Sequence, residues 1–230
     1  MTYEYLIFDL DDTLLDFTGG EVAAIRQLFS NELGLTGTDL DHALKTYQEI
    51  NHHLWQQYEF KEIARQQIFE ERFKKTLGAL GIDYDADRLE QEYATLRDHN
   101  YRMVPYATEI LQHLQNQYTI IAGTNGQDAT QRLRLRETGL DQYFDQIFTS
   151  EMIGASKPDA AFFDRIFQDN PQMTKENTVM IGDGLTSDIL GGQNYQLDTI
   201  WINPNHKESP SEIKPTQVVE DLPTLEALLQ

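Results

Sequence analysis

The chain has 230 residues, of which 38 are acidic and 18 basic, so its formal net charge is −20. This negative excess disfavours long-range attraction to nucleic acid or to an anionic membrane surface. The absence of cysteine excludes disulfides and thiol catalysis and agrees with a reducing compartment. Because the chain shows neither a signal-peptide pattern nor an apolar run of about 18 residues, we expect no membrane association and a cytoplasmic location.

The first predicted element is a buried strand that ends in a cluster of acidic residues. The apolar run 5–8 leads directly into segment 9–13, which reads DLDDT. Carboxylates crowded at a strand end repel one another and lose solvation, a cost that a cation or a reaction can offset. An EF-hand calcium loop would need glycine in place of Leu14 and glutamate in place of Gly20. A helix N-cap or a turn is the simple alternative for this segment taken alone.

Residues from about 17 to 100 show no strand signal and carry apolar residues at helical spacing instead. Two stripes, over 40–58 and 69–80, are more typical of a packed core than of a binding surface. We therefore predict an inserted cap of about four helices over residues 17–102, of the kind that opens and closes over an active site.

The rest of the chain alternates strand-like runs with helical stretches. This alternation predicts a parallel sheet with right-handed crossovers. Given the length of the chain, we predict an α/β, Rossmann-like core made of residues 1–16 and 103–230. We expect a loop over 205–215 and a short helix from about Pro223. The strand-like runs lie near residues 3–9, 118–124, 146–149, 178–182 and 198–203.

Three further segments each follow an apolar run and end in polar residues. They are the triplet Thr-Asn-Gly at 124–126, Lys157 in the segment SKPD, and Asp183 with Asp188 after the strand-like run 178–182. Taken singly, they read as an ordinary turn, a solvated lysine and an unremarkable aspartate. Their occurrence together with DLDDT, in this order, is specific.

These four segments resemble the motifs of the haloacid-dehalogenase-like (HAD) hydrolases, a superfamily of mostly magnesium-dependent phosphatases. The resemblance covers essentially the whole chain and implies an HAD core with an inserted helical cap. Other segments are similar to the bacterial pyrimidine 5′-nucleotidases, which implies a pyrimidine nucleoside 5′-monophosphate as substrate, with a phosphosugar or phosphoglycolate as the alternative. These segments are 51–55, 124–126, 134–135 with 138–140, 187–192 and 201–203.

The residue types fit phosphate ester hydrolysis. A phosphate monoester dianion repels anionic nucleophiles, so its charge must be neutralised before attack. With Lys157 and a metal ion screening the phosphoryl oxygens, the carboxylate of Asp9 can attack phosphorus and form an aspartyl phosphate. Asp11 lies two residues along an extended segment, close enough to act as general acid and then as general base. Thr124, with backbone N–H groups of the following turn, is suited to hold a phosphoryl oxygen.

Magnesium is the expected cofactor, because it binds a few carboxylates and keeps several waters. Asp9 and Asp183 are the predicted side-chain ligands. The resemblance adds the backbone carbonyl of Asp11, and a direct or indirect role for Asp188.

Substrate contacts are expected from four further residues. Thr13, Asn125 and Gly126 belong to the motif segments, and in the cap Trp55 offers an aromatic face for stacking on a base. The partner we expect is a small-molecule phosphate ester.

Other titratable residues are expected to lie outside the site. His52 and His53 lack partners at metal-ligand spacing, which favours surface or cap-packing roles. Arg132, Arg134 and Arg136 alternate along a predicted helix, which spreads them over different faces. We expect them to be solvated or ion-paired.

Two positions depart from the family pattern. Many related enzymes carry Pro-Gly after the cap, where this chain has Pro105-Tyr106, so we expect the turn back into the core to differ in shape. Gly184 follows Asp183 where related sequences often place a hydroxyl residue, which affects at most a minor phosphate or water contact.

Two functions of another class use similar residues. A signalling receiver module also carries acidic residues, Thr and Lys around a phosphorylated aspartate on a parallel sheet. A non-catalytic binding protein on the same fold is the second alternative. The large helical insertion and the position of Asp11 favour turnover, and magnesium-dependent phosphate release would separate the hydrolase from both.

Overall fold

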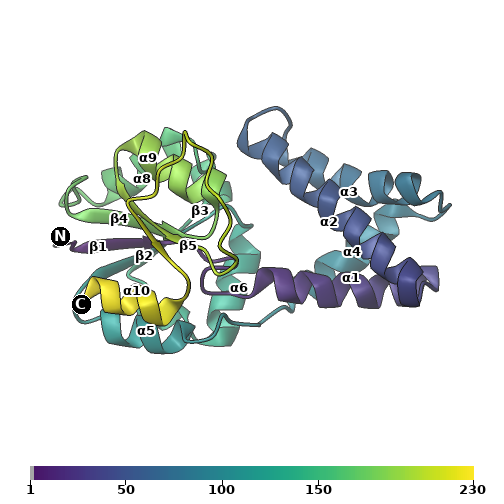
Figure 1. The fold of residues 1–230 in the computed structure, drawn as a ribbon, viewed down its shortest axis with the longest axis horizontal. Helices are drawn as coiled ribbons and strands as arrows, with labels where there is room; N and C mark the ends of the chain where they lie inside the picture. The colour runs from purple at the N-terminus through teal and green to yellow at the C-terminus, as the bar shows by residue number, and fades with distance from the viewer. Residues whose placement is uncertain (1–2) are drawn as a thin grey trace. The chain divides into compact units, whose positions relative to one another are not determined.

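The protein is described here from a computed structural model that covers residues 3–230 (Figure 1). The chain forms two compact units. One, the α/β unit, comprises the chain up to Asp16 and from Tyr101 onward, and the other, the helical unit, comprises Phe17–Asn100.

The α/β unit is built on a six-stranded sheet in the order β3-β2-β1-β4-β5-β6. All neighbouring strands are parallel, and the central strand β1 pairs Leu6 with Ile120 of β2 and with Val179 of β4. The predicted parallel α/β sheet is therefore confirmed. The strands are β1 (Tyr5–Phe8), β2 (Thr119–Thr124), β3 (Gln146–Thr149), β4 (Thr178–Gly182), β5 (Asp198–Ile202) and β6 (Gln217–Val219).

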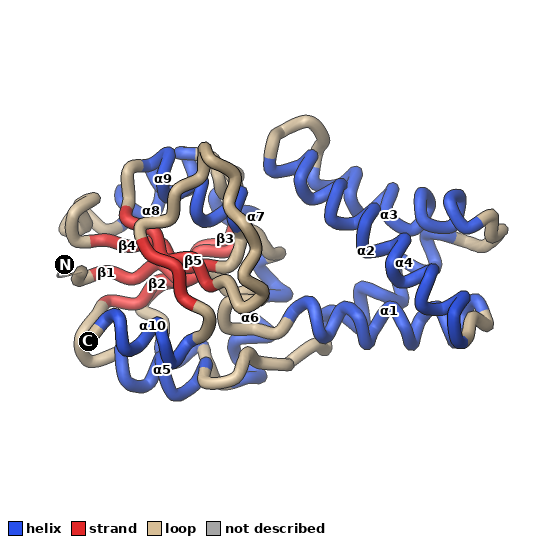
Figure 2. The backbone as a smooth tube through the Cα atoms, in the orientation of Figure 1, coloured by secondary structure: helices blue, strands red, loops and turns tan. Residues whose placement is uncertain are grey.

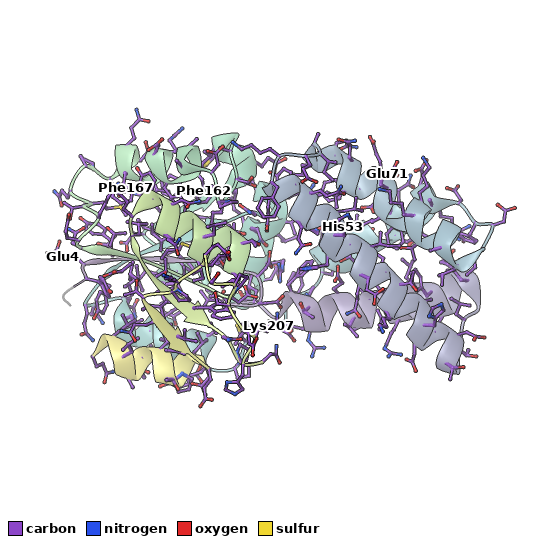
Figure 3. The ribbon with its side chains drawn as sticks, turned by 45° about the horizontal axis from the view of Figure 1, so that its top comes forward. Glu4, His53, Glu71, Phe162, Phe167 and Lys207 are labelled. Atoms are coloured by element: carbon purple, nitrogen blue, oxygen red, sulfur yellow. The ribbon has the colours of Figure 1, made fainter. Side chains whose placement is uncertain are left out.

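Helices cover both faces of this sheet (Figure 2), which explains why all four residues of β1 are buried. On one face Leu6 and Phe8 join a core with α5 and α10, and on the other Ile7 joins Phe162 of α8, labelled in Figure 3. The helices are α5 (Ala107–Leu114), α6 (Asp128–Thr138), α7 (Ser150–Ile153), α8 (Ala160–Asp169), α9 (Leu190–Tyr195) and α10 (Leu222–Leu229), with the short helices η1 (Asp141–Tyr143) and η2 (Leu185–Ile189).

The turn that leads into α5 contains a residue in the left-handed region. Tyr106, at the N-terminus of α5, has φ of 73°. This conformation costs a residue other than glycine roughly 1–2 kcal/mol. The Tyr106 hydroxyl donates to Glu226 of α10 at 2.7 Å, a contact that glycine would lack. With Tyr106 in place of glycine, the turn is conformationally less favourable, but its hydroxyl links α5 to α10 by a hydrogen bond.

The helical unit consists of four helices around an aromatic core. Tyr47 stacks on Phe73 with ring centroids 5.2 Å apart, and both rings contact Phe29 edge-on. His53, labelled in Figure 3, and its neighbour His52 are exposed on α2, which agrees with the surface position expected for them. The helices are α1 (Phe17–Leu33), α2 (Gly37–Glu59), α3 (Arg65–Leu80) and α4 (Ala86–Asp98).

Two buried charged residues of the helical unit, Glu21 and Arg72, have hydrogen-bond partners on neighbouring helices. Glu21 Oε1 accepts from the hydroxyls of Tyr47 and Tyr93, at 3.2 and 3.0 Å, and from Asn51 Nδ2 at 3.1 Å. Arg72 is only 2% exposed and makes two hydrogen bonds to Glu90, at 2.7 and 2.5 Å. These contacts tie α1, α2, α3 and α4 together.

Candidate active site

Asp9 lies at the centre of the candidate site, where β1 ends. Its backbone N–H donates to the carbonyl of Ile181 at 2.8 Å, which continues the pairing with β4 by one residue. The residue is 7% exposed, and its Oδ1 accepts a hydrogen bond from Lys157 Nζ at 2.7 Å. The sheet therefore holds one carboxylate rigidly, facing a cation.

Lys157 is fully surrounded by acceptors. Besides Asp9, its Nζ lies 2.7 Å from Asp188 Oδ1 and donates to the carbonyl of Gly123 at 2.6 Å. Although burial opposes the charged form, the carboxylates of Asp188 and Asp9 raise the pKa of Lys157 above its ordinary value. The ammonium is a fixed positive charge in the site.

Asn125 positions this lysine through its backbone. Its Oδ1 accepts from the Lys157 N–H and its Nδ2 donates to the Lys157 carbonyl, both at 2.9 Å. Both polar atoms of the Asn125 side chain are therefore engaged within the protein. The substrate contact expected of Asn125 stays a prediction, while the structure gives it a second role in placing Lys157.

Three carboxylates converge beside the lysine. One oxygen each from Asp9, Asp183 and Asp188 can be chosen so that all three lie within 4.8 Å of one another. Asp188 is fixed by a hydrogen bond from the Gly184 N–H at 2.9 Å. At Gly182 an added Cβ would lie 2.2 Å from Asp188 Oδ2, so only glycine leaves room for this arrangement.

The carboxylates are electrostatically strained against one another. Burial raises the pKa of Asp9 to about 8, with Lys157 opposing the rise and Asp188 and Asp11 adding to it. Burial also raises the pKa of Asp183 well above its ordinary value, and Asp9 and Asp188 raise it further. One ammonium does not balance this charge. The excess negative charge and the hard oxygen donors fit a divalent cation such as magnesium.

The backbone around Asp183 is anchored from two sides. Its N–H donates to Thr13 Oγ1 at 3.1 Å, and its carbonyl accepts from the Trp201 indole at 2.9 Å. Thr13 is completely buried. In the structure Thr13 thus supports the loop of Asp183, and its expected substrate contact stays a prediction.

Thr124 and Gly126 form a tight turn at the end of β2. The Thr124 side chain is 1% exposed, and its Oγ1 accepts from the Gly126 N–H at 3.0 Å. It also accepts from Gln131 Nε2 at 2.9 Å. The hydroxyl expected to hold a phosphoryl oxygen is therefore held firmly by its own turn and by α6.

Asp11 is held by two residues of α6, Gln131 and Arg134, that were not predicted from the sequence as site residues. Arg134 Nη1 donates to Asp11 Oδ1 at 2.5 Å, and Gln131 Nε2 donates to Oδ2 at 2.8 Å. Arg134 was expected to be either solvated or ion-paired. The structure shows the ion pair, and the Arg134 side chain is only 1% exposed. The available signal was the spacing of three residues, which puts Gln131 and Arg134 on one face of the helix after Thr124.

Trp55 belongs to the helical unit. It lies on α2 and is partly exposed, with the Tyr58 ring 5.9 Å away between centroids. The guanidinium carbon of Arg65 lies 5.9 Å from the centroid of the Trp55 ring. The indole thus belongs to a cluster of aromatic and cationic groups.

Comparison with known proteins identifies the family. The model of the haloacid dehalogenase-like hydrolases matches residues 3–195. The chain belongs to this family. The resemblance seen in the sequence is thereby confirmed, and so is the prediction that the protein is an enzyme of this hydrolase class.

Several HAD relatives align over nearly the full chain. Pyrimidine 5′-nucleotidase PynA of Streptococcus pneumoniae is 39% identical, over 95% of this chain and 92% of its own length. Pyrimidine 5′-nucleotidase YjjG of Escherichia coli is 32% identical, over 100% of this chain and 99% of its own length. The crystal structure of the HAD hydrolase YfnB of Bacillus subtilis, bound to magnesium, superposes with a TM-score of 0.92 at 36% identity and covers 100% of both chains.

Within residues 3–230, every helix is too short or too polar to span a membrane.

Proposed function

We propose that this HAD hydrolase is a magnesium-dependent phosphomonoesterase that acts through an aspartyl phosphate on Asp9. The observation that carries the proposal is the placement of Asp9. Its carboxylate sits at the end of the central strand, 2.7 Å from the ammonium of Lys157, within a cluster of three carboxylates. The carboxyl end of the parallel sheet thus brings together a proposed nucleophile, a fixed cation and a set of hard oxygen ligands.

The metal site is proposed from the donor set. Asp9 and Asp183 would hold magnesium with the backbone carbonyl of Asp11, and Asp188 would support it directly or through Lys157. When bound, magnesium supplies positive charge that neutralises the phosphoryl oxygens. The excess of carboxylates over ammonium groups in the site supports this assignment.

The chain's own residues then divide the reaction into two displacements. An oxygen of Asp9 attacks phosphorus, and the bond from phosphorus to the leaving alkoxide breaks as Asp11 gives that alkoxide a proton. Lys157 stabilises the charge on the phosphoryl oxygens, and Thr124 donates a hydrogen bond to one of them. Asp11 next takes a proton from water, which attacks the phosphoryl group, releases phosphate and restores Asp9.

We propose pyrimidine nucleoside 5′-monophosphates as the substrates. Two relatives that align over at least 92% of their own length are named pyrimidine 5′-nucleotidases. The helical unit is proposed to act as a cap, in which the partly exposed Trp55 stacks on the base. Relatives at 26–28% identity are named glyceraldehyde 3-phosphate phosphatases, which keeps a phosphosugar as the second candidate.

A panel of phosphate esters assayed with magnesium tests both levels of the proposal. We expect kcat/KM for pyrimidine ribo- and deoxyribonucleoside monophosphates to exceed that for phosphoglycolate, a triose phosphate and a hexose phosphate. A maximum on a phosphosugar would reject the nucleotide substrate and keep the phosphatase. A stable phosphoprotein without turnover would favour a receiver, and ester binding without release of phosphate would favour a binding protein.

A further inference from the structure

Gln131 and Arg134 of α6 form a continuous hydrogen-bond chain that links Thr124 to Asp11. Gln131 Nε2 is within hydrogen-bond distance of Thr124 Oγ1, at 2.9 Å, and of Asp11 Oδ2, at 2.8 Å. Arg134 Nη1 donates to Gln131 Oε1 at 3.0 Å and to Asp11 Oδ1 at 2.5 Å. Both α6 side chains are 1% exposed. These hydrogen bonds therefore lie in the protein interior and end at two residues of the candidate site.

The chemistry of these groups determines the direction of each hydrogen bond. A guanidinium has only donors, so the Gln131 atom that faces Arg134 must be the carbonyl oxygen. The amide nitrogen of Gln131 then faces the other two partners, and its two hydrogens match Asp11 and Thr124. No alternative orientation of the Gln131 amide satisfies Arg134.

This direction has a consequence for the Thr124 hydroxyl. A hydroxyl has two acceptor positions and one hydrogen. Both acceptor positions of Thr124 are used, by Gln131 Nε2 and by the Gly126 N–H. In the described part of the chain no acceptor takes the remaining hydrogen, so the hydroxyl is left as a donor. A donor is the group that an anionic phosphoryl oxygen requires.

We propose that Gln131 and Arg134 are positioning residues, which hold Thr124 as a hydrogen-bond donor to the phosphoryl group and hold the side chain of Asp11, the proposed acid and base, at the same site. The proposal rests on the proposed phosphatase function. Gly126 contributes space, because a Cβ at this position would lie 2.5 Å from the Gln131 side chain. If these hydrogen bonds were only structural, breaking them would lower the stability of the protein and leave its affinity for phosphate unchanged.

The variant Gln131→Glu tests the direction of the hydrogen bonds with almost no change in volume. A carboxylate at this position keeps the contact with Arg134, but it takes the Thr124 hydrogen for itself and no longer donates a hydrogen bond to Asp11. We expect the Kd for inorganic phosphate, measured by calorimetry with magnesium, to rise about ten-fold, the range of one hydrogen bond to a charged group. The control Gln112→Glu makes the same charge change at an exposed position of α5 and should leave that Kd unchanged.

Steady-state kinetics separate the effects on Thr124 and Asp11. In Gln131→Glu we expect kcat to fall more for a nucleoside monophosphate, whose leaving group needs a proton, than for p-nitrophenyl phosphate. KM should rise for both esters. A Kd for phosphate and kinetic constants within two-fold of wild type would overturn the proposal.

A double-mutant cycle with Thr124→Val tests whether Gln131 acts through the threonine. Without the hydroxyl, the effect of Gln131→Glu on phosphate affinity should shrink to less than two-fold, and persistence of the full effect would contradict the proposal. If Gln131→Glu does not fold, Gln131→Met removes both donated hydrogens without adding charge and should weaken phosphate binding in the same direction.

These outcomes are distinguishable from failure of the proposed function. A wild-type protein that hydrolyses esters, with an unaffected Gln131→Glu variant, would reject only the positioning role. If the double-mutant cycle gives the expected phosphate affinities but the wild-type protein hydrolyses no ester, only the proposed phosphatase activity would be rejected. A wild-type protein that neither binds phosphate nor hydrolyses esters would reject both.

Discussion

The two units of the chain both bury charged groups, but they balance them in different ways. In the helical unit Arg72 is matched by Glu90, and Glu21 accepts three hydrogen bonds. In the α/β unit, one ammonium faces three converging carboxylates. A balanced buried cluster holds helices together, whereas an unbalanced one has a free-energy cost that a bound cation can offset. The comparison suggests a criterion within one chain: buried charges that are paired serve the fold, and buried charges in excess mark the candidate active site.

The largest effect is expected from Asp9→Asn, which removes one charge from the unbalanced cluster. Turnover should fall by at least about a thousand-fold, because the amide cannot act as a nucleophile. The metal-free stability at pH 8 should be equal or higher, since a carboxylate with a raised pKa is removed. Steady-state assays and urea unfolding measure the two quantities, with the exposed Asp141→Asn as control. Turnover within a few-fold of wild type would exclude Asp9 as the nucleophile.

The opposite result is expected when the balanced cluster is broken. Arg72→Met leaves Glu90 without its cation and should lower the free energy of unfolding by about 3 kcal/mol. The control Arg26→Met breaks an ion pair with Asp41 in which the two side chains are 45% and 60% exposed. It should cost less than about 1 kcal/mol. Equal losses in the two variants, measured by urea unfolding, would show that burial of the Arg72 pair carries no special weight.

Asp183→Asn should weaken the metal site while leaving the nucleophile in place. We expect the magnesium concentration for half-maximal activity to rise about ten-fold or more. The variant Asp188→Asn extends the test, because it also removes the negative charge that is ion-paired with Lys157 and should lower kcat even at saturating magnesium. An unchanged magnesium requirement in Asp183→Asn would place the ion elsewhere.

The smallest effect concerns pH. The pKa of Asp9 is raised from 3.8 to about 8, so the folded state holds protons more tightly than the unfolded state. The metal-free protein therefore loses stability as pH rises through this window. Magnesium binds the deprotonated carboxylates, so its stabilisation should grow across the same range. At about 100 times Kd we expect it to raise Tm by about 5 °C or more at pH 8. The increase should be at most about half as large at pH 5, and equal increases in thermal scans would contradict the charge-based interpretation.

The sequence predicted those parts of the α/β unit that follow from local pattern. Five strands lie close to the predicted runs, because buried parallel strands read as continuous apolar segments. The sixth, β6, was not predicted, since it has three residues and only Val219 is buried. Its existence depends on pairing with β5 across a long loop, which no local pattern encodes.

The candidate site shows the same division. Asp9, Asp183 and Asp188 could be singled out because each follows or lies near a strand end, and the structure brings them together. Gln131 and Arg134 were missed because their importance depends on which side of α6 faces Asp11. That contact spans 123 residues of sequence for Arg134. The substrate roles of Thr13 and Asn125 are untested, and in the structure both support the backbone around the site.

Trp201 makes the carboxylate cluster accessible to fluorescence. Its indole donates to the carbonyl of Asp183 at 2.9 Å, and its ring packs against Ile189 and Ile213. The chain has only two tryptophans, so a Trp55→Phe variant would emit from Trp201 alone. Any shift of the Asp183 backbone should change the environment of the indole N–H and thereby its emission. A magnesium titration of that variant would then report on the metal site without substrate, dye or turnover.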